Sequence, residues 1–448
     1  MNPIRIKKGY DLNVEGRPSN KIEQLPNPAY VAAVPEKIPF IKPRLAVKIG
    51  DEVKIGTVLF VDKRAPEIKF LSPGGGKVEQ INFGPRRIIR EIVIKLESEE
   101  ASEAFEKVPE TQLGHLKRHD LVKILLNGGL WPLIRQLPYR DIADPGKIPP
   151  AVFVSLDAGE PFQPASRVYL ADQKELFAYG IQILRKLAQD NVYVTARHEN
   201  REVPAEYNQW ITHFYTGKYP AADPGVLLYH TRTSADANRC WYISGQDLLL
   251  LARLLKTGKY PVERIVALGG TLCSDPGHVG TRLGVPLAHL AGDRKQEKNI
   301  RYIAGGLFRG YTASENTFLG YYEKSLLLLP AGDQEEVFGF VRPGFNKPSY
   351  SRAFLSYFNT AALPMDCNRH GGVRACIACG YCAQVCPVDI LPQLTFKAVE
   401  ADAVEEFLAH GLLDCVECGL CTYVCPSKIE LADILVHAKA AYYKEQTA

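Results

Sequence analysis

The chain has no long apolar run, no strong excess of charge and no familiar membrane or nucleic-acid signature. Its longest apolar stretches, which begin at Leu248 and Ser325, are far shorter than the roughly 20 residues that cross a bilayer. The formal net charge is only +4 over 448 residues, which gives no reason to expect a nucleic-acid or acidic-substrate partner. We therefore expect no transmembrane segment and no nucleic acid, so that any membrane role comes through a partner.

Motifs for phosphate binding and hydrolysis are also missing. The sequence contains no Walker-type G-x-x-x-x-G-K-[ST], no G-x-G-x-x-G after a predicted strand, no H-E-x-x-H and no G-x-S-x-G. We therefore assign no catalytic residue. The nearest candidate for a phosphate-binding loop runs from Asn127 to Pro132 and offers Gly128, Gly129 and Trp131. Two glycines and a proline also make an ordinary turn, so both interpretations stay open.

Eight of the eleven cysteines lie in two copies of one pattern near the C-terminus. The run C-x2-C-x2-C-x3-C-P extends from Cys376 to Pro387 and again from Cys415 to Pro426. Such runs supply thiolates to [4Fe–4S] clusters, and in two-cluster proteins the fourth cysteine of each run ligates the other cluster. The expected ligands are Cys376, Cys379, Cys382 and Cys425 for cluster 1, and Cys415, Cys418, Cys421 and Cys386 for cluster 2.

Structural zinc and disulfides are the alternatives for these cysteines. Zinc also binds four thiolates, but it usually takes two C-x-x-C pairs separated by a longer loop, which a repeated run of four fits poorly. Nothing at the N-terminus resembles an apolar signal segment, so a reducing compartment is expected and disulfides are not. Gly380 and Gly419 follow the second cysteine of each run, where a glycine allows close approach to a cluster and a positive φ. Cys240, Cys273 and Cys367 are not expected to be cluster ligands.

The rest of the chain shows three patterns. Residues 40 to 97 predict short strands, with Ile89, Ile92 and Ile94 separated by charged residues. A β-branched run from Ala151, a helical pattern from Lys174 and a second such run from Asn191 predict a parallel α/β layer. The region from about 257 to 345 predicts a mixed β unit with glycine turns.

Several segments resemble a known family. I-K-K-G-Y-D-L from Ile6, K-P-R-L-A-V-K-I-G-D-E-V-K-I-G from Lys42, N-G-G-L-W-P-L-I-R from Asn127 and S-Y-S-R-A-F-L from Ser349 resemble the NqrA family, which provides the A subunit of the sodium-translocating NADH:quinone oxidoreductase (Nqr). The C-terminal C-V-E-C-G-L-C-T-Y-V-C-P-S-K-I from Cys415 is similar instead to the C subunit of the related Rnf complex, which carries two [4Fe–4S] clusters.

The resemblance implies a multidomain fold of the class α/β plus β. Residues 1–100 would form a barrel-sandwich (biotinyl/lipoyl-like) domain and 101–256 a Rossmann-like α/β domain. Residues 257–345 would form a β-grasp (SLBB-like) domain, and 346–448 an α-helical dicluster ferredoxin-like domain with two [4Fe–4S] clusters. Carrier domains of the first type modify a lysine on a hairpin tip. The long spacing from Lys63 to Pro73 favours an unmodified, scaffolding lysine here.

The same resemblance implies an electron-transfer subunit of a membrane-associated, ion-translocating NADH:quinone or ferredoxin-linked oxidoreductase. It would be peripheral on the cytoplasmic side of the inner membrane, with the other Nqr/Rnf-type subunits and a ferredoxin or flavoprotein donor as partners. Where the Rnf protein has G-G-A-x-F-P-T, this chain has Leu130-Trp131 after Gly128-Gly129, which argues against FMN and NADH on this chain and leaves quinone open. The alternatives are a non-redox docking or quinone-binding subunit with structural clusters, and an enzyme that oxidises NADH itself.

Overall fold

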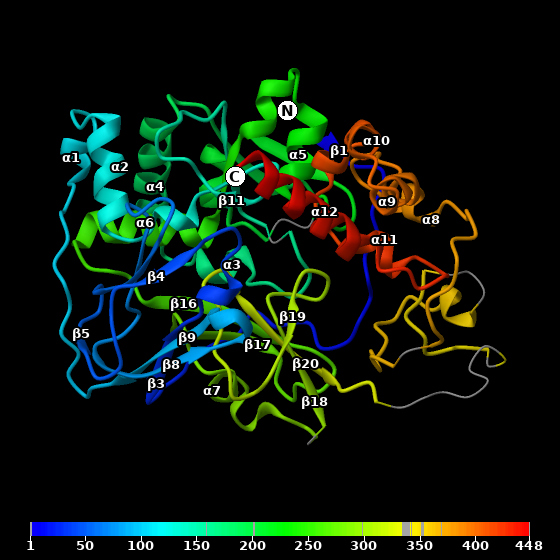
Figure 1. Cartoon of the computed structure of the whole chain (residues 1–448), viewed down its shortest axis with the longest axis horizontal. Coiled ribbons are helices and arrows are strands. Elements are labelled where there is room, and N and C mark those ends of the chain that lie inside the picture. The colour runs from blue at the N-terminus through cyan, green and yellow to red at the C-terminus, as the bar shows by residue number, and fades with distance from the viewer. Residues whose placement is uncertain are drawn as a thin grey trace.

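In the computed structural model the described residues of the chain form four β-sheets and a C-terminal group of helices (Figure 1). The structure describes residues 2–157, 159–199, 202–297, 299–333, 341, 343–350, 354–368 and 370–447. The segment from Ser349 that carries part of the family resemblance lies partly outside these residues, since 351–353 are not among them.

The N-terminal strands form the two small sheets of a barrel sandwich. One sheet has the antiparallel order β3 (Tyr30–Ala33), β9 (Ile89–Leu96), β8 (Gly76–Phe83) and β5 (Glu52–Val53), and the other has β4 (Pro43–Leu45), β6 (Val58–Asp62) and β7 (Lys69–Leu71). The predicted pattern in β9 is confirmed, because Ile92 and Ile94 are buried while Arg90 and Lys95 are exposed. Lys63 follows β6 directly and is exposed.

The largest sheet is the α/β layer. Its order is β1 (Ile4–Arg5), β14 (His213–Thr216), β13 (Val192–Arg197), β12 (Val152–Ser155), β15 (Trp241–Ser244), β10 (Arg135–Gln136) and β11 (Asp141–Ile142). The first five strands are parallel, and β10 pairs antiparallel with both of its neighbours, β15 and β11. The predicted strand, helix, strand order is observed as β12, α4 (Lys174–Leu187) and β13. Apolar residues of α4 at helical spacing, among them Phe177, Ile181 and Leu184, are buried in the core.

Other helices of this layer are α1 (Glu110–Leu113), α2 (Arg118–Asn127), α3 (Ser166–Tyr169), α5 (Pro224–Thr231) and α6 (Gly245–Thr257). Helix α6 packs beside α4. It begins where the side chain of Ser244 accepts a hydrogen bond from the backbone N–H of Asp247, and it ends at Gly258, whose φ of 66° is left-handed. One continuous apolar core joins α1, α2, α3, α4 and α6 to the barrel sandwich, whereas α5 packs in a second core with residues of the C-terminal region.

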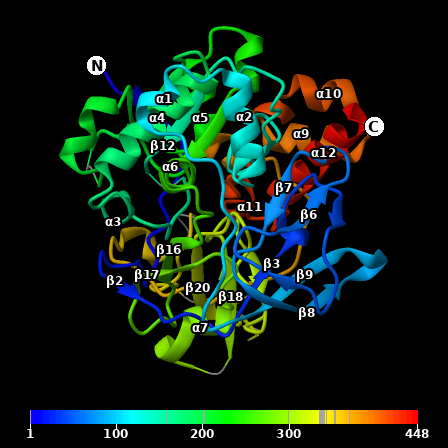
Figure 2. The same ribbon diagram turned by 90° about the vertical axis from the view of Figure 1, so that its left-hand side faces the viewer.

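A six-stranded mixed sheet lies below the α/β layer in Figure 1. Its order is β19 (Tyr311–Ala313), β18 (Ile300–Ala304), β20 (Ser325–Pro330), β16 (Glu263–Gly269), β17 (Gly277–Arg282) and β2 (Ile22–Gln24), and α7 (Leu287–Ala291) packs against it. Figure 2 shows β2 at the edge beside β17, with which it pairs in parallel. The N-terminal arm therefore supplies β1 to one sheet and β2 to another before the barrel sandwich begins.

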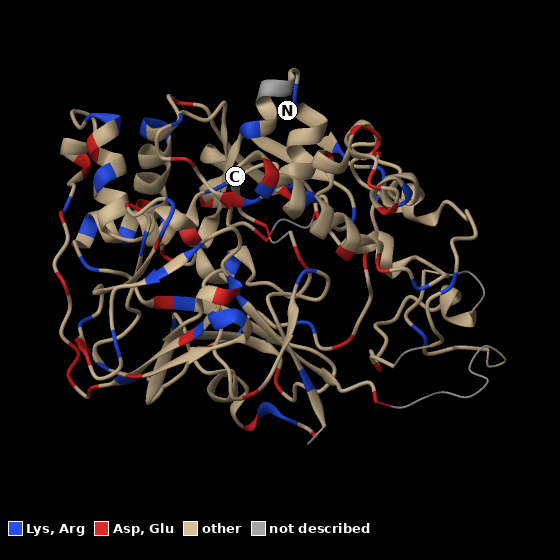
Figure 3. Cartoon of the chain, viewed as in Figure 1, with Lys and Arg blue, Asp and Glu red and all other residues tan. Residues whose placement is uncertain are grey.

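The C-terminal helices are α8 (Tyr381–Val385), α9 (Pro392–Glu400), α10 (Val404–Ala409), α11 (Leu420–Tyr423) and α12 (Leu431–Gln446). Short 3₁₀ turns are η1 (Pro35–Lys37), η2 (Pro85–Arg87), η3 (Trp131–Leu133), η4 (Ala205–Trp210), η5 (Ala235–Arg239), η6 (Gly292–Arg294), η8 (Leu355–Phe358) and η9 (Leu412–Asp414). Figure 3 shows basic and acidic residues interspersed along the chain. Within the described ranges, no helix combines the length and apolarity needed to cross a membrane.

Candidate functional site

The two cysteine runs have the same local backbone shape. Gly380 and Gly419 have φ values of 77° and 76° and begin the short helices α8 and α11. Ala378 and Glu417, at equivalent positions between the first two cysteines, also have positive φ. The expectation of positive φ at both glycines is thus confirmed, and each run turns sharply between its first three cysteines.

The structure brings the last cysteine of the second run to the first run. One small cavity is lined by Cys376, Cys379, Cys382 and Cys425 together, along with apolar residues such as Ile429. The thiol of Cys382 donates a hydrogen bond to Gln393 Oε1 at 3.1 Å. Cys425 and the first three cysteines of the first run, which are far apart in the sequence, therefore share one enclosed space.

The second group gathers around Cys421. Burial raises the pKa of this thiol well above its ordinary value, and the neighbouring thiols of Cys418, Cys415 and Cys386 raise it further. Burial likewise raises the pKa of Cys418 and of Cys386 to about 12. Burial thus keeps these three thiols protonated in the chain alone, and the mutual effect of the thiols shows that they lie close together.

The two groups differ in exposure. Around the second, Val416 and Val424 are buried and Leu420 is fully buried. At the first, Ile377 is 68% exposed and Cys379 is exposed as well. The first group thus lies at the surface, and the second lies against the α/β layer.

Four consecutive carbonyl groups of the second run each accept a hydrogen bond from a side chain outside the run. The donors come from α12, from the loops before β11 and β19, and from the loop before α5. They are Lys439 Nζ to Cys415 O (2.8 Å), Arg309 Nη2 and Arg140 Nη2 to Val416 O (2.7 and 3.0 Å), Arg309 Nε to Glu417 O (3.0 Å), and Tyr219 Oη to Cys418 O (2.8 Å).

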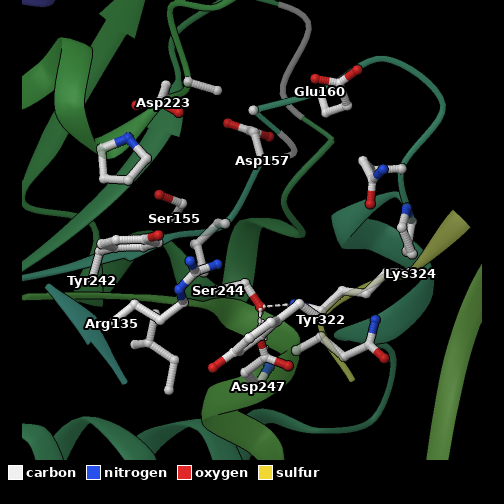
Figure 4. Close-up of a pocket in the computed structure, with 18 of the residues that line it drawn as sticks. Arg135, Ser155, Asp157, Glu160, Asp223, Tyr242, Ser244, Asp247, Tyr322 and Lys324 are labelled. Atoms are coloured by element: carbon white, nitrogen blue, oxygen red, sulfur yellow. Dashed lines mark hydrogen bonds and ion pairs between the residues drawn. The ribbon is translucent and has the colours of Figure 1, made fainter. Parts of the chain in front are cut away.

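A cavity of about 240 Å³ lies next to this loop, at the carboxyl ends of β12 and β15 (Figure 4). The chain runs from β12 to β13 on one side and reaches β15 on the other, so this is the switch point of the parallel sheet, where open α/β sheets bind ligands. Its charged lining is evenly divided between the two signs. It consists of Arg135, Arg140, Arg309, Lys324, Asp157, Glu160, Asp223 and Asp247.

Most of the cations in this cavity are paired with carboxylates of the same chain. Asp223 Oδ1 lies 2.8 Å from Arg140 Nη2, and Asp223 Oδ2 lies 2.7 Å from Arg309 Nη2. Burial alone would raise the pKa of Asp223, but the two arginines outweigh it and hold this pKa to about 2. Asp247 pairs with Lys324, and it lies 3.3 Å from Arg264.

The two paired carboxylates also stand at helix N-termini. Asp223 caps α5 and accepts the N–H of Gly225 at 2.8 Å, while Asp247 lies in the first turn of α6. Helix N-termini attract anions, and here the protein supplies the anions itself. The guanidinium of Arg135 lies over the Tyr322 ring, 4.4 Å from its centroid.

The loop with Gly128, Gly129 and Trp131 lies in the core and does not line this cavity. A Cβ at Gly128 would meet Leu254 Cδ2 at 2.2 Å, and one at Gly129 would meet Leu71 Cγ at 2.3 Å. Trp131 is fully buried, donates from Nε1 to Ala143 O at 2.7 Å, and packs edge-on against Trp241. The small residues of this loop therefore accommodate neighbouring leucine side chains.

The other three cysteines belong to neither group, although Cys240 shares an apolar core cluster with Cys386 and Cys418. Cys240 and Cys273 are buried, and burial raises the pKa of Cys240 to about 11. Cys367 packs near Leu327 and Leu329 of β20.

Sequence reasoning missed the cavity because its charged residues are scattered from Arg135 to Lys324. One signal was present. Ser155 lies near the end of one predicted strand and Asp157 follows it, and such carboxyl ends meet at one edge of a parallel sheet. The arginines of the cavity had no such signal.

Comparison with known proteins gives three matches to family models. They are the "NqrA N-terminal barrel-sandwich hybrid domain" over residues 4–97, the "NqrA second alpha/beta domain" over 116–260 and the "4Fe-4S dicluster domain" over 375–429.

Whole-length relatives agree with these matches. The A subunit of the Na(+)-translocating NADH-quinone reductase from Yersinia pestis bv. Antiqua (strain Angola) is 32% identical over 420 residues, which is 92% of each chain. Its counterpart from Pseudomonas aeruginosa (strain PAO1) is 33% identical over 392 residues, or 87% of each chain. Among solved structures, an air-oxidized NAD+-reducing [NiFe]-hydrogenase aligns with a TM-score of 0.33 and 12% identity over 52% of each chain.

The barrel sandwich, the α/β domain and the 4Fe-4S dicluster domain together define a component of an iron–sulfur oxidoreductase complex. More particularly, the chain belongs to the NqrA family, the A subunits of the Na(+)-translocating NADH-quinone reductase.

Proposed function

We propose that this chain is the electron-transfer subunit of an Nqr/Rnf-type NADH:quinone or ferredoxin-linked oxidoreductase and relays single electrons through two [4Fe–4S] clusters. The grouping of eight cysteines into two crossed sets carries this proposal. Cluster 1 takes Cys376, Cys379, Cys382 and Cys425, which line one cavity. Cluster 2 takes Cys415, Cys418, Cys421 and Cys386. The first, second and last of these thiols lie near enough to Cys421 to raise the pKa of its thiol.

The spacing of the cysteines favours cubane clusters over zinc. A tetrahedral zinc site usually takes two C-x-x-C pairs separated by a longer loop. Each run here reads C-x2-C-x2-C-x3-C-P, the pattern that supplies ligands to [4Fe–4S] clusters. When bound, the clusters would supply one-electron chemistry.

The exposure of the two groups supports an assignment of which cluster faces a partner protein and which lies inside the chain. Cluster 1 would lie at the surface, where Ile377 is 68% exposed, within reach of a partner protein. That partner is another subunit of the complex, or a ferredoxin or flavoprotein donor. Cluster 2 would lie inside, next to the cavity. The complex would hold this chain at the cytoplasmic face of the membrane.

The cavity supports the proposal that FMN and NADH bind elsewhere in the complex. Phosphate groups bind at cations and helix N-termini. Here Asp223 and Asp247 already neutralise Arg140, Arg309 and Lys324, three of the four cations of the cavity, and stand at the N-termini of α5 and α6. Gly128, Gly129 and Trp131 stay a proposed remnant of a nicotinamide or flavin loop. The switch point fits a Rossmann-like domain over 101–256. For the remaining domains we keep 1–100 as barrel sandwich, 257–345 as SLBB-like and 346–448 as the cluster domain.

A docking or quinone-binding subunit with purely structural clusters is the second candidate. The four capped carbonyls of Cys415 to Cys418 favour it, because they tie the C-terminal region to the α/β layer, and metal binding can serve folding alone.

Anaerobic reduction separates the two candidates. The full chain, purified with its iron, is titrated with reductant across the range of biological donors and followed by EPR. The relay predicts two cubane signals that interact magnetically. Clusters that stay oxidised throughout that range would contradict it and support the structural role. Bound flavin, or hydride transfer from NADH to it, would contradict the absence of FMN and NADH.

A further inference from the structure

We propose that Arg140 and Arg309 are positioning residues that raise the reduction potential of cluster 2 independently of cluster 1, with Asp223 limiting their effect. This inference rests on the proposed electron relay and concerns how its two clusters are made different.

The contacts place both guanidinium groups directly on the cluster 2 loop. Arg309 donates to Val416 O at 2.7 Å and to Glu417 O at 3.0 Å, and Arg140 donates to Val416 O at 3.0 Å. Val416 and Glu417 are the two residues between the ligands Cys415 and Cys418. Each arginine thus contacts the backbone between two expected ligands of cluster 2, and its hydrogen bonds hold the turn on which both cysteines stand.

The charges of these arginines act in a buried environment. Side-chain exposure is 9% for Arg140 and 1% for Asp223, and 24% for Arg309. Charges interact more strongly there than at the surface, because little water screens them. Reduction adds one electron to the cluster, so a nearby positive charge favours the reduced form and raises the potential.

Asp223 opposes this effect from the other side of the arginines. Its carboxylate touches both guanidinium groups, at 2.8 and 2.7 Å. It stays ionised because the arginines overcome the cost of its burial. The carboxylate therefore holds the two arginines in place and also partly cancels their charge at cluster 2.

Cluster 1 has a more exposed environment. Its loop is exposed at Ile377 and Cys379. Two cations contact its backbone, Arg374 Nη2 at Pro426 O and Lys8 Nζ at Ala383 O, both at 3.1 Å, but Arg374 is exposed and the Lys8 side chain is 37% exposed. Water at the surface screens charges near it. Changes at Arg309 or Asp223 should therefore reach cluster 2 far more than cluster 1.

The test is a redox titration of both clusters by EPR in the full chain. Arg309→Gln removes a positive charge and should shift the midpoint potential of cluster 2 to more negative values. Asp223→Asn removes a negative charge, keeps a good helix cap, and should shift it to more positive values. Arg253→Gln, at a partly exposed ion pair with Glu263, is the matched control and should shift neither. A variant that lacks cluster 1, Cys425→Ala, assigns the signals.

The inference is supported if the midpoint potential of cluster 2 alone shifts, and shifts in opposite directions in Arg309→Gln and Asp223→Asn. A general loosening of the structure would not shift the potential in opposite directions according to the charge removed. Equal shifts of both clusters, shifts of the same sign in the two variants, or no shift would overturn it. If Arg309→Gln loses cluster 2, Arg309→Lys keeps the charge and Asp223→Asn carries the test. A wild-type chain without reducible clusters would instead contradict the relay itself.

Discussion

Lys439 and Glu417 form a buried ion pair that joins the C-terminal helix to the second cysteine run. Lys439 Nζ lies 2.9 Å from Glu417 Oε1, and the two side chains are 4% and 20% exposed. The same ammonium donates to the carbonyl of Cys415 at 2.8 Å. Burial would raise the pKa of Glu417, but Lys439 and Arg140 outweigh it and lower this pKa.

We predict that Lys439→Met destabilises the C-terminal region by about 1–3 kcal/mol, because the buried Glu417 carboxylate and the Cys415 carbonyl lose their shared donor, while Arg140, 3.7 Å away, still faces the carboxylate. Anaerobic urea unfolding, followed by the loss of iron–sulfur absorbance, measures this effect. Lys444→Met replaces an exposed lysine of the same helix and should change stability by less than about 0.5 kcal/mol. Equal midpoints for the two variants would show that the pair contributes nothing.

Cys425→Ala should damage the cluster held by Cys376, Cys379 and Cys382. It should spare the cluster held by the other three cysteines of its own run. This follows because Cys425 lines the cavity of the first run. Iron analysis and EPR would show one intact cluster and no magnetic interaction. Cys273→Ala, at a buried cysteine outside both groups, should keep both clusters. Loss of the cluster at Cys415, Cys418 and Cys421 would refute the crossed ligation.

Asp247→Asn should destabilise the α/β layer by about 3–5 kcal/mol, because Lys324 and Arg264 then face each other in the interior without a counter-charge. Asp247 touches both cations and is 9% exposed. Thermal or urea unfolding would measure the cost. The control is Glu263→Gln, whose carboxylate is 82% exposed opposite Arg253, and it should cost under about 1 kcal/mol. Similar losses in both variants would contradict this account.

The stability of the fold should fall as pH drops below about 6.5, in part through His278. Burial lowers the pKa of His278. Its ring accepts the N–H of Ala165 at 3.0 Å and contacts Ser19 O at 2.7 Å. An unfolded histidine binds a proton at about pH 6.5, whereas the folded one does so only at lower pH. Protonation therefore favours the unfolded chain, and the stability present above pH 6.5 is lost between that value and the lowered pKa.

Melting temperatures at pH 7.5 and 5.5 test this expectation. His278→Gln retains one donor and one acceptor but does not titrate, so its stability should depend less on pH than that of the wild type. His437→Gln, at a 76% exposed side chain, should leave the dependence unchanged. An unaltered pH dependence in His278→Gln would remove His278 as its source.

Gly129→Ala should destabilise the protein by about 1–3 kcal/mol through overpacking. The added methyl group would meet Leu71 Cγ at 2.3 Å, and the φ of +65° strains any larger residue. Gly114→Ala, with nothing within 4 Å of its new Cβ, is the control and should be nearly neutral. A stable Gly129→Ala would mean that packing does not require this glycine.

The sequence carried the features that depend on neighbouring residues. The spacing of the two cysteine runs, with Gly380 and Gly419 at fixed offsets, is a local property. It predicted the left-handed glycines that the structure shows. The strand and helix patterns of β12, α4 and β13 were equally visible, because their periods arise within a few residues.

Contacts between distant segments were not visible in this way. Arg140, Asp223, Arg309 and Glu417 are isolated in the sequence, and each could have been an ordinary surface charge. The parallel strand order and the packing of the second cysteine run on the α/β layer bring them within hydrogen-bond distance. Likewise, no pattern near Ile22 showed that this segment pairs with β17.

The sequence by itself thus determined which residues offer metal ligands and how each run turns, because those properties lie within a dozen consecutive residues. The tertiary structure alone decided which loop is buried, which is exposed, and which charges face the second cysteine run. The reason is physical: burial and electrostatic pairing depend on distances through space, which a chain fixes only when its distant segments pack together.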